Sequence, residues 1–348
     1  MWLRYGVNAT GKLIEIQDVT SGKTNLRCPY CGKALIAKKG NIKEHHFAHE
    51  GETCNLVIKR QPRDIPHLPL YDAFNIFLTG KELEQLKKLW HRHKSHRLGI
   101  DRLEILPAFT RENLIERSPL TNAATGRNAY QFTELGMIPV GALPLAQFNP
   151  LHELQIRQKL TQLEAAVFDN SGSVLPPGEL QVRLTDLRIY CAQMRKILLP
   201  SLYYLKVQAD GQVLYKIGIT TRIMPKRLVE IYRDLRSLFG AVEVEVLQTW
   251  ANRGNVERYF KYRYSDFNHP IGSLTEYFRF AEPDETHAVE RDLSQMQTKV
   301  LSPVEQDIVD GKQDDRLAVV LADEQMAAGN LRVSDGRKAN RLRHRLQA

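Results

Sequence analysis

The sequence predicts an α+β protein of several domains, and three observations support this fold class. Cysteines and histidines cluster within residues 28–54, two β-rich runs flank a turn within 202–220, and segments with helical spacing lie before and after those runs. At 348 residues the chain is long enough for two or three domains, and its hydrophobic content of 43% is normal for buried cores.

The first predicted element is a small metal-binding ribbon. Residues 12–19 alternate enough to form a strand, which leads to a Cys-x2-Cys knuckle followed by glycine. Such a knuckle lets backbone amides approach the thiolates, and zinc prefers four sulfur or nitrogen ligands in a tetrahedron. We therefore predict a structural zinc site. Its ligands are Cys28, Cys31, Cys54 and a histidine, for which we prefer His49 to His46 because His49 lies closer to Cys54; His45 is the least suitable.

The knuckle, the following His-Phe-Ala-His run and the further cysteine together resemble the N-terminal zinc module of CoiA-like competence nucleases, over about residues 1–60. In that family the module accompanies a different nuclease core. The resemblance implies a portable zinc ribbon that handles nucleic acid.

The next segments are predicted to be mainly helical. Residues 61–147 form a linker and a middle region of unassigned role, with helical spacing at 71–89 and a basic, histidine-rich run at 90–97. That run either contacts phosphate or is a solvated helix end. Residues 148–199 are expected to form a helical hairpin, whose helices cover about 149–168, with Asn149-Pro150 as N-cap and first turn, and 178–198.

A β-hairpin with flanking helices is predicted next. Asp210-Gly211 supplies the two residues of a type I′ turn between the runs of Leu202–Thr220. Pro225 suits the first turn of a helix, and apolar residues follow it at helical spacing. A third strand at 242–246 and a helix at 256–264 complete a small antiparallel sheet flanked by helices.

Four positions in this region carry a second resemblance. Leu202-Tyr203-Tyr204, Lys216-Ile217-Gly218, Arg227 and Glu276 resemble, in order and spacing, the GIY-YIG nucleases, specifically the phage-type branch with lysine in the second motif, over about residues 200–282. Two features depart from the family: Leu202 replaces the usual glycine, and no asparagine occurs between Tyr277 and Val300.

The GIY-YIG resemblance implies a division of catalytic roles. Tyr204 would deprotonate the attacking water, Lys216 would favour its phenolate, Arg227 would stabilise charge on the phosphate, and Glu276 would hold Mg²⁺ or Mn²⁺. Tyr203 and Tyr204 point to opposite faces of one strand, and the motif register favours Tyr204 as the functional residue.

The C-terminal part, residues 283–348, is predicted as a helical extension with a basic tail. Helical patterns cover 286–300 and 303–321, and arginines accumulate after residue 332. Such a cluster suits electrostatic contact with phosphates without sequence reading. The predicted nucleic-acid-binding residues are Arg222, Lys226, Arg341 and Arg343.

Charge and composition set the expected partner and compartment. A formal net charge of +9 and a pI near 9.3 favour a polyanionic partner. With no membrane-length apolar run, no signal peptide and only four cysteines, we expect a cytoplasmic protein without a membrane partner.

The sequence therefore leads to one main hypothesis and one alternative. The main hypothesis is a metal-dependent DNA endonuclease with a zinc-ribbon docking module, with RNA as an alternative substrate. One active centre per subunit predicts either a homodimer or two successive visits to cut a duplex. The alternative is a non-catalytic zinc-ribbon protein that binds nucleic acid or regulates, with a degenerate GIY-YIG fold.

Overall fold

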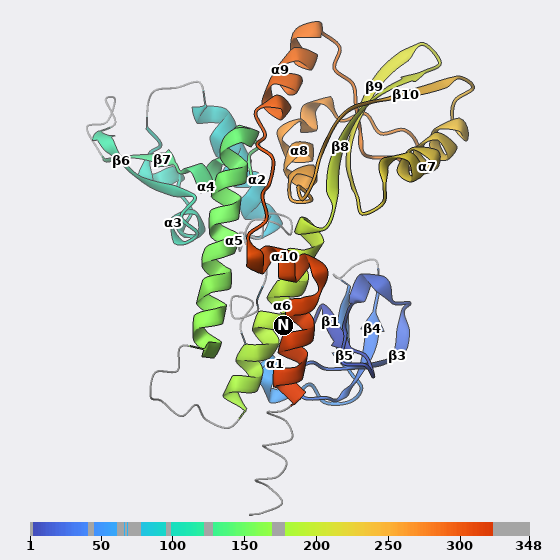
Figure 1. Cartoon of the computed structure of the whole chain (residues 1–348). Coiled ribbons are helices and arrows are strands. Elements are labelled where there is room, and N and C mark those ends of the chain that lie inside the picture. The colour runs from blue at the N-terminus through green and yellow to red at the C-terminus, as the bar shows by residue number, and fades with distance from the viewer. Residues whose placement is uncertain are drawn as a thin grey trace, which may run out of the picture. The chain divides into compact units, whose positions relative to one another are not determined.

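The computed structural model describes residues 3–40, 45–60, 66, 68, 78–94, 99–121, 128–168 and 178–322. These residues form two compact units, each built from separate stretches of chain (Figure 1). The first unit takes in the described parts of Met1–His67, Arg157–Arg195 and Leu301–Ala348, and the second those of Leu68–Ile156 and Lys196–Val300. This grouping differs from the five consecutive segments expected from the sequence, because contacts join stretches that are far apart along the chain.

The first unit contains a five-stranded antiparallel sheet in the order β2-β1-β3-β4-β5. The predicted strand at 12–19 is shorter than expected, because a turn of 3₁₀-helix at Ile16–Asp18 follows it. The elements are β1 Tyr5–Val7, β2 Leu13–Glu15, β3 Gly22–Arg27, β4 Ala34–Lys38, β5 His46–His49 and the short helix α1 Asn55–Ile58.

Helical residues of the same unit pack on this sheet module. Within α6 (Glu179–Leu198), Ile189 belongs to the same buried core as the sheet, and Val182 and Ala192 pack against that core. The α5 residues of the unit also contact α6, since Arg183 donates a hydrogen bond from Nη1 to the Ala166 carbonyl at 2.7 Å. Arg183 thus joins the α5 and α6 residues of this unit.

The helix α5 (Leu145–Phe168) begins earlier than the sequence predicted, and Pro150 lies inside it rather than in its first turn. Leu145 and Phe148 are buried in the core of the second unit, and the Leu145 N–H donates to Asp292 Oδ1 at 3.0 Å. The Asp292 carboxylate satisfies this N–H, and apolar packing stabilises the added turn. The helix therefore starts four residues before Asn149.

The C-terminal helices overlap their predicted ranges of 286–300 and 303–321, but the first ends six residues early and the second is divided. Helix α9 covers Pro283–Ser294 and α10 covers Pro303–Asp310, with Ser302 and Glu305 forming a capping box. Residues 312–322 are helical again. Gly311 interrupts the predicted continuous helix because its φ of 84° lies in the left-handed region.

Part of the middle region forms a small α/β layer in the second unit. Strands β6 (Ile115–Thr121) and β7 (Asn128–Phe132) pair, and α2 (Gly80–His93) starts at a capping box between Thr79 and Glu82. The basic run begins within the last turn of α2, where Arg92 and His93 contact Glu104 at 2.6 and 3.1 Å, so these two side chains are engaged within the protein. The short helices are α3 Pro107–Arg111 and α4 Glu134–Met137.

The main sheet of the second unit has the strand order β10-β8-β9-β11, all antiparallel. The turn between β8 and β9 has φ of 46° at Asp210 and 78° at Gly211, as a type I′ turn requires. Figure 1 shows α7 and α8 beside this sheet. The elements are β8 Ser201–Ala209, β9 Gln212–Thr220, α7 Met224–Arg236, β10 Val242–Trp250, α8 Val256–Arg263 and β11 Tyr277–Phe278.

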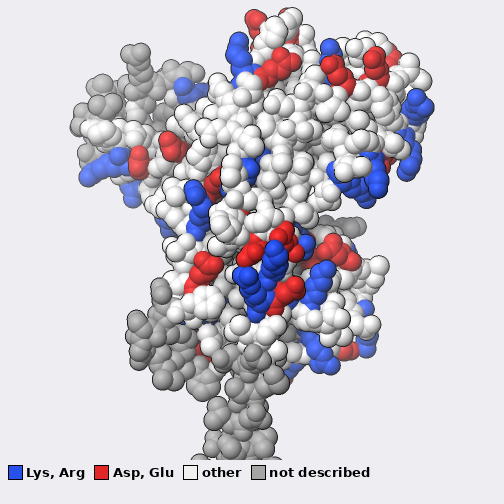
Figure 2. All heavy atoms as spheres, viewed as in Figure 1, with Lys and Arg blue, Asp and Glu red and all other residues white. Residues whose placement is uncertain are grey.

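The two faces of this sheet enter different cores. One face packs under α7, where Leu205, Ile231 and Leu235 are buried together. The other packs against α8 with Leu202 and Phe260. Lys and Arg side chains gather on the exposed surface over α7 (Figure 2). None of the described helices is both long and apolar enough to cross a membrane.

Candidate metal centre and candidate active site

The ligand atoms of Cys28, Cys31, His49 and Cys54 all lie within 4.8 Å of one another, which brings the four side chains chosen from the sequence into one cluster. Cys28 and Cys31 are set by a tight turn, in which the Gly32 N–H bonds to the Cys28 carbonyl at 2.9 Å and Gly32 has a φ of 73°. Three thiols and one imidazole are the donors that zinc prefers, so this cluster could hold a zinc ion.

Strand parity decides between the two histidines. His46 and His49 stand at opposite ends of β5 and are three residues apart, so their side chains point to opposite faces. His49 is buried, and its Nε2 lies 3.3 Å from Cys31 Sγ. Burial, with the charge of Lys33, lowers the pKa of His49, which favours the neutral imidazole that binds metals. His46 is outside the cluster.

The knuckle is also tied to a helix of its own unit. Tyr30, between the two cysteines, donates a hydrogen bond to Asp186 Oδ1 at 2.7 Å, and the Arg60 guanidinium lies 5.2 Å from the centre of the Tyr30 ring while pairing with Asp186. Burial raises the pKa of Cys28 to about 12. Without a bound cation, the module therefore holds Cys28 as a thiol.

A second cluster forms on the face of the main sheet that α7 covers. Tyr203 on β8 stands opposite Gly218 on β9, and Lys216 pairs with Tyr277 on β11. Arg227 projects from α7 to this face and donates from Nε to the Tyr203 hydroxyl at 3.3 Å.

The carboxylate of Glu276 lies in the same cluster. Its Oε2 accepts from Lys216 Nζ at 2.8 Å, and its Oε1 accepts from Lys261 Nζ on α8 at 3.1 Å. Lys216 Nζ also lies 4.5 Å from the centre of the Tyr277 ring. Tyr203, Lys216, Arg227 and Glu276 therefore converge, three of them being residues chosen from the sequence.

Tyr204, the tyrosine preferred from the sequence, is on the other face of the sheet. The centre of its ring lies 5.7 Å from that of Tyr215 and 6.2 Å from that of Phe260. Its hydroxyl is buried without a hydrogen-bond partner among the described residues. Burial raises the pKa of this phenol far above its usual range. Because strand side chains alternate, a shift of one residue in the motif register exchanges the two faces, and the residue beside Arg227 is Tyr203.

The electrostatics of the cluster also differ from the expected arrangement. Burial raises the pKa of Tyr203, and it is Arg227, not Lys216, whose hydrogen bond and charge act to lower it. For Glu276, burial acts to raise the pKa, but the charges and hydrogen bonds of Lys216 and Lys261 outweigh it, so the pKa lies below its ordinary value. Glu276 is therefore ionised at neutral pH. Burial lowers the pKa of Lys216, with Glu276 opposing that change.

Sequence reasoning missed four members of this cluster. Two are Tyr203 and Tyr277, and two are Glu257 and Lys261, which are paired at 3.6 Å on α8. Burial raises the pKa of Glu257. The spacing of four between Glu257 and Lys261 was a readable signal for a helical pair, but nothing in the sequence placed that pair beside Glu276.

The predicted nucleic-acid-binding residues fall into three cases. Arg222 is ion-paired with Glu230, which also pairs with Arg227 at 2.7 Å. Lys226 is exposed on α7 and makes no ion pair with the described residues. Arg341 and Arg343 lie outside the described residues.

Comparison with known proteins supports the resemblance of the N-terminal module to CoiA. Residues 12–56 match the family model described as competence protein CoiA, N-terminal domain. The matched stretch contains the four residues of the metal-binding cluster. No curated protein and no solved structure matches the chain. The chain is thus a mixed α/β protein whose residues 12–56 match the CoiA N-terminal domain and contain a cluster that could hold zinc.

Proposed function

We propose that the protein is a metal-dependent DNA endonuclease of GIY-YIG type, whose zinc module docks on the substrate. The observation that supports this proposal is a pair of contacts beside the β8–β9 hairpin, Arg227 with Tyr203 and Lys216 with Glu276. The charge of Glu276 also acts on both Tyr203 and Arg227. Phosphodiester hydrolysis needs a base for water, a cation on the phosphate oxygens and a group that stabilises developing charge.

In this proposal the four residues divide the work as follows. The Tyr203 hydroxyl takes the proton of the attacking water, and Arg227, 3.3 Å away, stabilises both the phenolate and the phosphate charge. Lowering a phenol pKa from ~10 to ~7.5 requires roughly 3–4 kcal/mol. One cation about 4 Å away contributes on the order of 4 kcal/mol at an effective dielectric of about 20, before desolvation is subtracted. Burial of Tyr203 opposes this gain, so Arg227 and a bound cation must act together.

The residues present fit a magnesium or manganese ion. The Glu276 side chain is 35% exposed and ionised, and Mg²⁺ keeps several waters while binding one or two carboxylates and substrate phosphates. When bound, the ion would withdraw charge from the phosphate oxygens. Both Glu276 oxygens accept hydrogen bonds from lysines, so Lys216 or Lys261 would have to give up its contact for Glu276 to hold the ion.

Plasmid cleavage tests the proposal. The purified protein is incubated with supercoiled plasmid and Mg²⁺ or Mn²⁺, beside Glu276→Ala, Tyr203→Phe and, as matched control, Tyr204→Phe. We expect the wild type and Tyr204→Phe to cut, and the other two to lose activity by at least about a hundredfold. Equal cutting by all four proteins excludes this active site. Cutting of single-stranded RNA in place of plasmid would keep the chemistry and change the substrate.

The second candidate function is non-catalytic binding of nucleic acid. It is favoured by the two lysines on Glu276 and by the missing family asparagine between Tyr277 and Val300. It predicts salt-dependent DNA binding with no cleavage in Mg²⁺ or Mn²⁺. Plasmid nicking that Glu276→Ala abolishes rules it out.

A further inference from the structure

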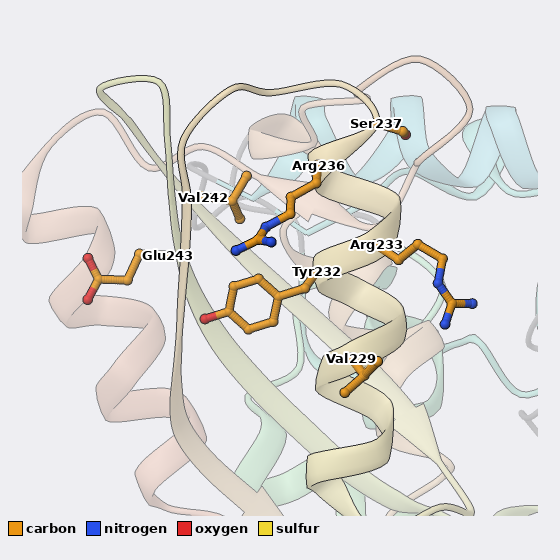
Figure 3. A pocket seen from close by; sticks show the side chains of 7 residues that line it. All are labelled: Val229, Tyr232, Arg233, Arg236, Ser237, Val242 and Glu243. Atoms are coloured by element: carbon orange, nitrogen blue, oxygen red, sulfur yellow. The ribbon is translucent and has the colours of Figure 1, made fainter.

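A groove of about 720 Å³ lies between α7 and the edge strand β10, away from the Tyr203 cluster. Figure 3 shows the side chains that line it, which are Val229, Tyr232, Arg233, Arg236, Ser237, Val242 and Glu243. By helical geometry, Val229, Tyr232 and Arg236 lie on the side of α7 opposite Arg227. The groove is therefore distinct from the candidate active site.

Tyr232 fixes the wall of this groove. Its hydroxyl accepts from the Val244 N–H at 3.0 Å, which ties α7 to the outer edge of β10. β10 is an edge strand of the described sheet, and the hydroxyl satisfies one of its outward N–H groups. The groove is thus held open between two rigid elements.

The two arginines of the groove are available to a ligand. Arg233 and Arg236 are exposed and form no ion pair with any residue that the structure describes. By contrast, Arg222 and Arg227 both pair with Glu230. In Figure 3 Arg236 extends over Tyr232 toward β10, Arg233 points outward, and the Glu243 carboxylate points away from both. The Glu243 carboxylate therefore does not pair with either arginine.

The spacing of these arginines suits a strand with regularly placed anions. Residues three apart on a helix have Cβ atoms about 5–6 Å apart, so two guanidinium groups that point in different directions reach two separate groups of one ligand. Guanidinium groups bind phosphate in a bidentate manner, and the Tyr232 ring supports one of them through a cation–π contact. The Arg236 guanidinium carbon lies 5.9 Å from the centre of that ring.

We propose that the α7–β10 groove binds the phosphate backbone of a nucleic-acid strand through Arg233 and Arg236, at a distance from the cleavage centre. The net charge of +9 and the basic surface over α7 in Figure 2 are complementary to that ligand. This inference rests on the proposed action on nucleic acid and adds a second contact with the same substrate.

The test is the salt dependence of binding, measured by fluorescence anisotropy with a labelled 20-base-pair duplex. The Glu276→Ala background without added divalent cation is used to keep the DNA intact. The variant is Arg233→Gln/Arg236→Gln. The control is Arg291→Gln, which removes one exposed cation from α9. We expect the slope of log K against log salt to fall by roughly 0.9 per arginine in the variant and to stay unchanged in the control.

A second variant separates charge from folding. Arg233→Lys/Arg236→Lys keeps both charges, so the salt slope should return while affinity stays below that of the parent. If the Arg233→Gln/Arg236→Gln variant keeps the salt slope of the parent, the groove does not bind the DNA backbone. The same result is expected if the natural ligand of the groove is an acidic peptide. If the parent binds no DNA at any salt concentration, the proposed function fails together with the groove. If the wild type cuts DNA and the slope is unaltered, the groove alone fails.

Discussion

A Cβ atom added to Gly218 would lie 2.4 Å from the hydroxyl of Tyr203. The two residues stand opposite each other on β9 and β8, and the phenol lies over the space that glycine leaves open. The glycine is therefore needed for a steric reason rather than for a turn, and it fixes the position of the hydroxyl that contacts Arg227.

Gly218→Ala should accordingly displace the Tyr203 ring. We expect a loss of about 1–3 kcal/mol in the free energy of unfolding, the usual range for overpacking, and reduced cleavage. Urea denaturation followed by circular dichroism measures the first effect. Gly240→Ala is the control, because its Cβ would be 3.5 Å from the nearest atom, an ordinary contact. Wild-type stability in Gly218→Ala would contradict the packing described.

The two neighbouring tyrosines should respond differently to loss of the hydroxyl. Tyr204→Phe removes a buried group without a partner among the described residues, so stability should be unchanged or higher by up to about 1 kcal/mol. Tyr203→Phe removes a hydrogen bond with Arg227 and should cost about 0.5–1.5 kcal/mol. Thermal unfolding of both variants compares them. The reverse order would mean that the faces of β8 are exchanged.

Zinc content should depend on His49 and not on His46. His49→Ala removes one of four clustered ligands, while His46→Ala changes the opposite face of β5. We expect one zinc per chain in the wild type and in His46→Ala, and a marked loss in His49→Ala after dialysis against a weak chelator. Metal analysis by mass spectrometry gives the readout. Equal retention by both variants would remove His49 from the ligand set.

Asp210 should make stability depend on pH in the acid range. Its carboxylate accepts from the Ala241 and Gly240 N–H groups, which lower its pKa below the ordinary 3.8. A lowered folded-state pKa stabilises the fold above 3.8, and this stabilisation is lost as pH falls through the folded-state value. Asp210→Asn keeps a residue that tolerates the positive φ but removes the charge.

The difference in urea midpoint between wild type and Asp210→Asn should therefore be constant near neutral pH and shrink below 3.8. A difference that persists unchanged at pH 2 would mean that the charge of Asp210 does not contribute.

Local signals in the sequence predicted local structure well. Asp210-Gly211 gave the hairpin turn, and the range 178–198 closely matches α6. The Cys-x2-Cys knuckle, with His49 and Cys54, predicted the clustered donors. The coarse fold class, a mixed α/β chain with small antiparallel sheets, is confirmed. These features depend on neighbouring residues, which is why a single sequence reveals them.

Features that depend on distant contacts were not predictable. Choosing Tyr204 over Tyr203 required the absolute register of β8, and both residues are aromatic and buried, so composition gave no distinction. The start of α5 depends on Asp292, which is far along the chain. Glu257 and Lys261 join the cluster only because α8 packs beside β9.

The contact between Tyr30 and Asp186 has a consequence for biosynthesis. The metal-binding knuckle shares its buried core with Ile189, so the N-terminal module lacks part of its packing until α6 has left the ribosome. At typical elongation rates, the delay after residue 54 is on the order of ten seconds. During that interval the core that contains Cys28 and Cys54 lacks Ile189, and early capture of zinc would protect these thiols from oxidation.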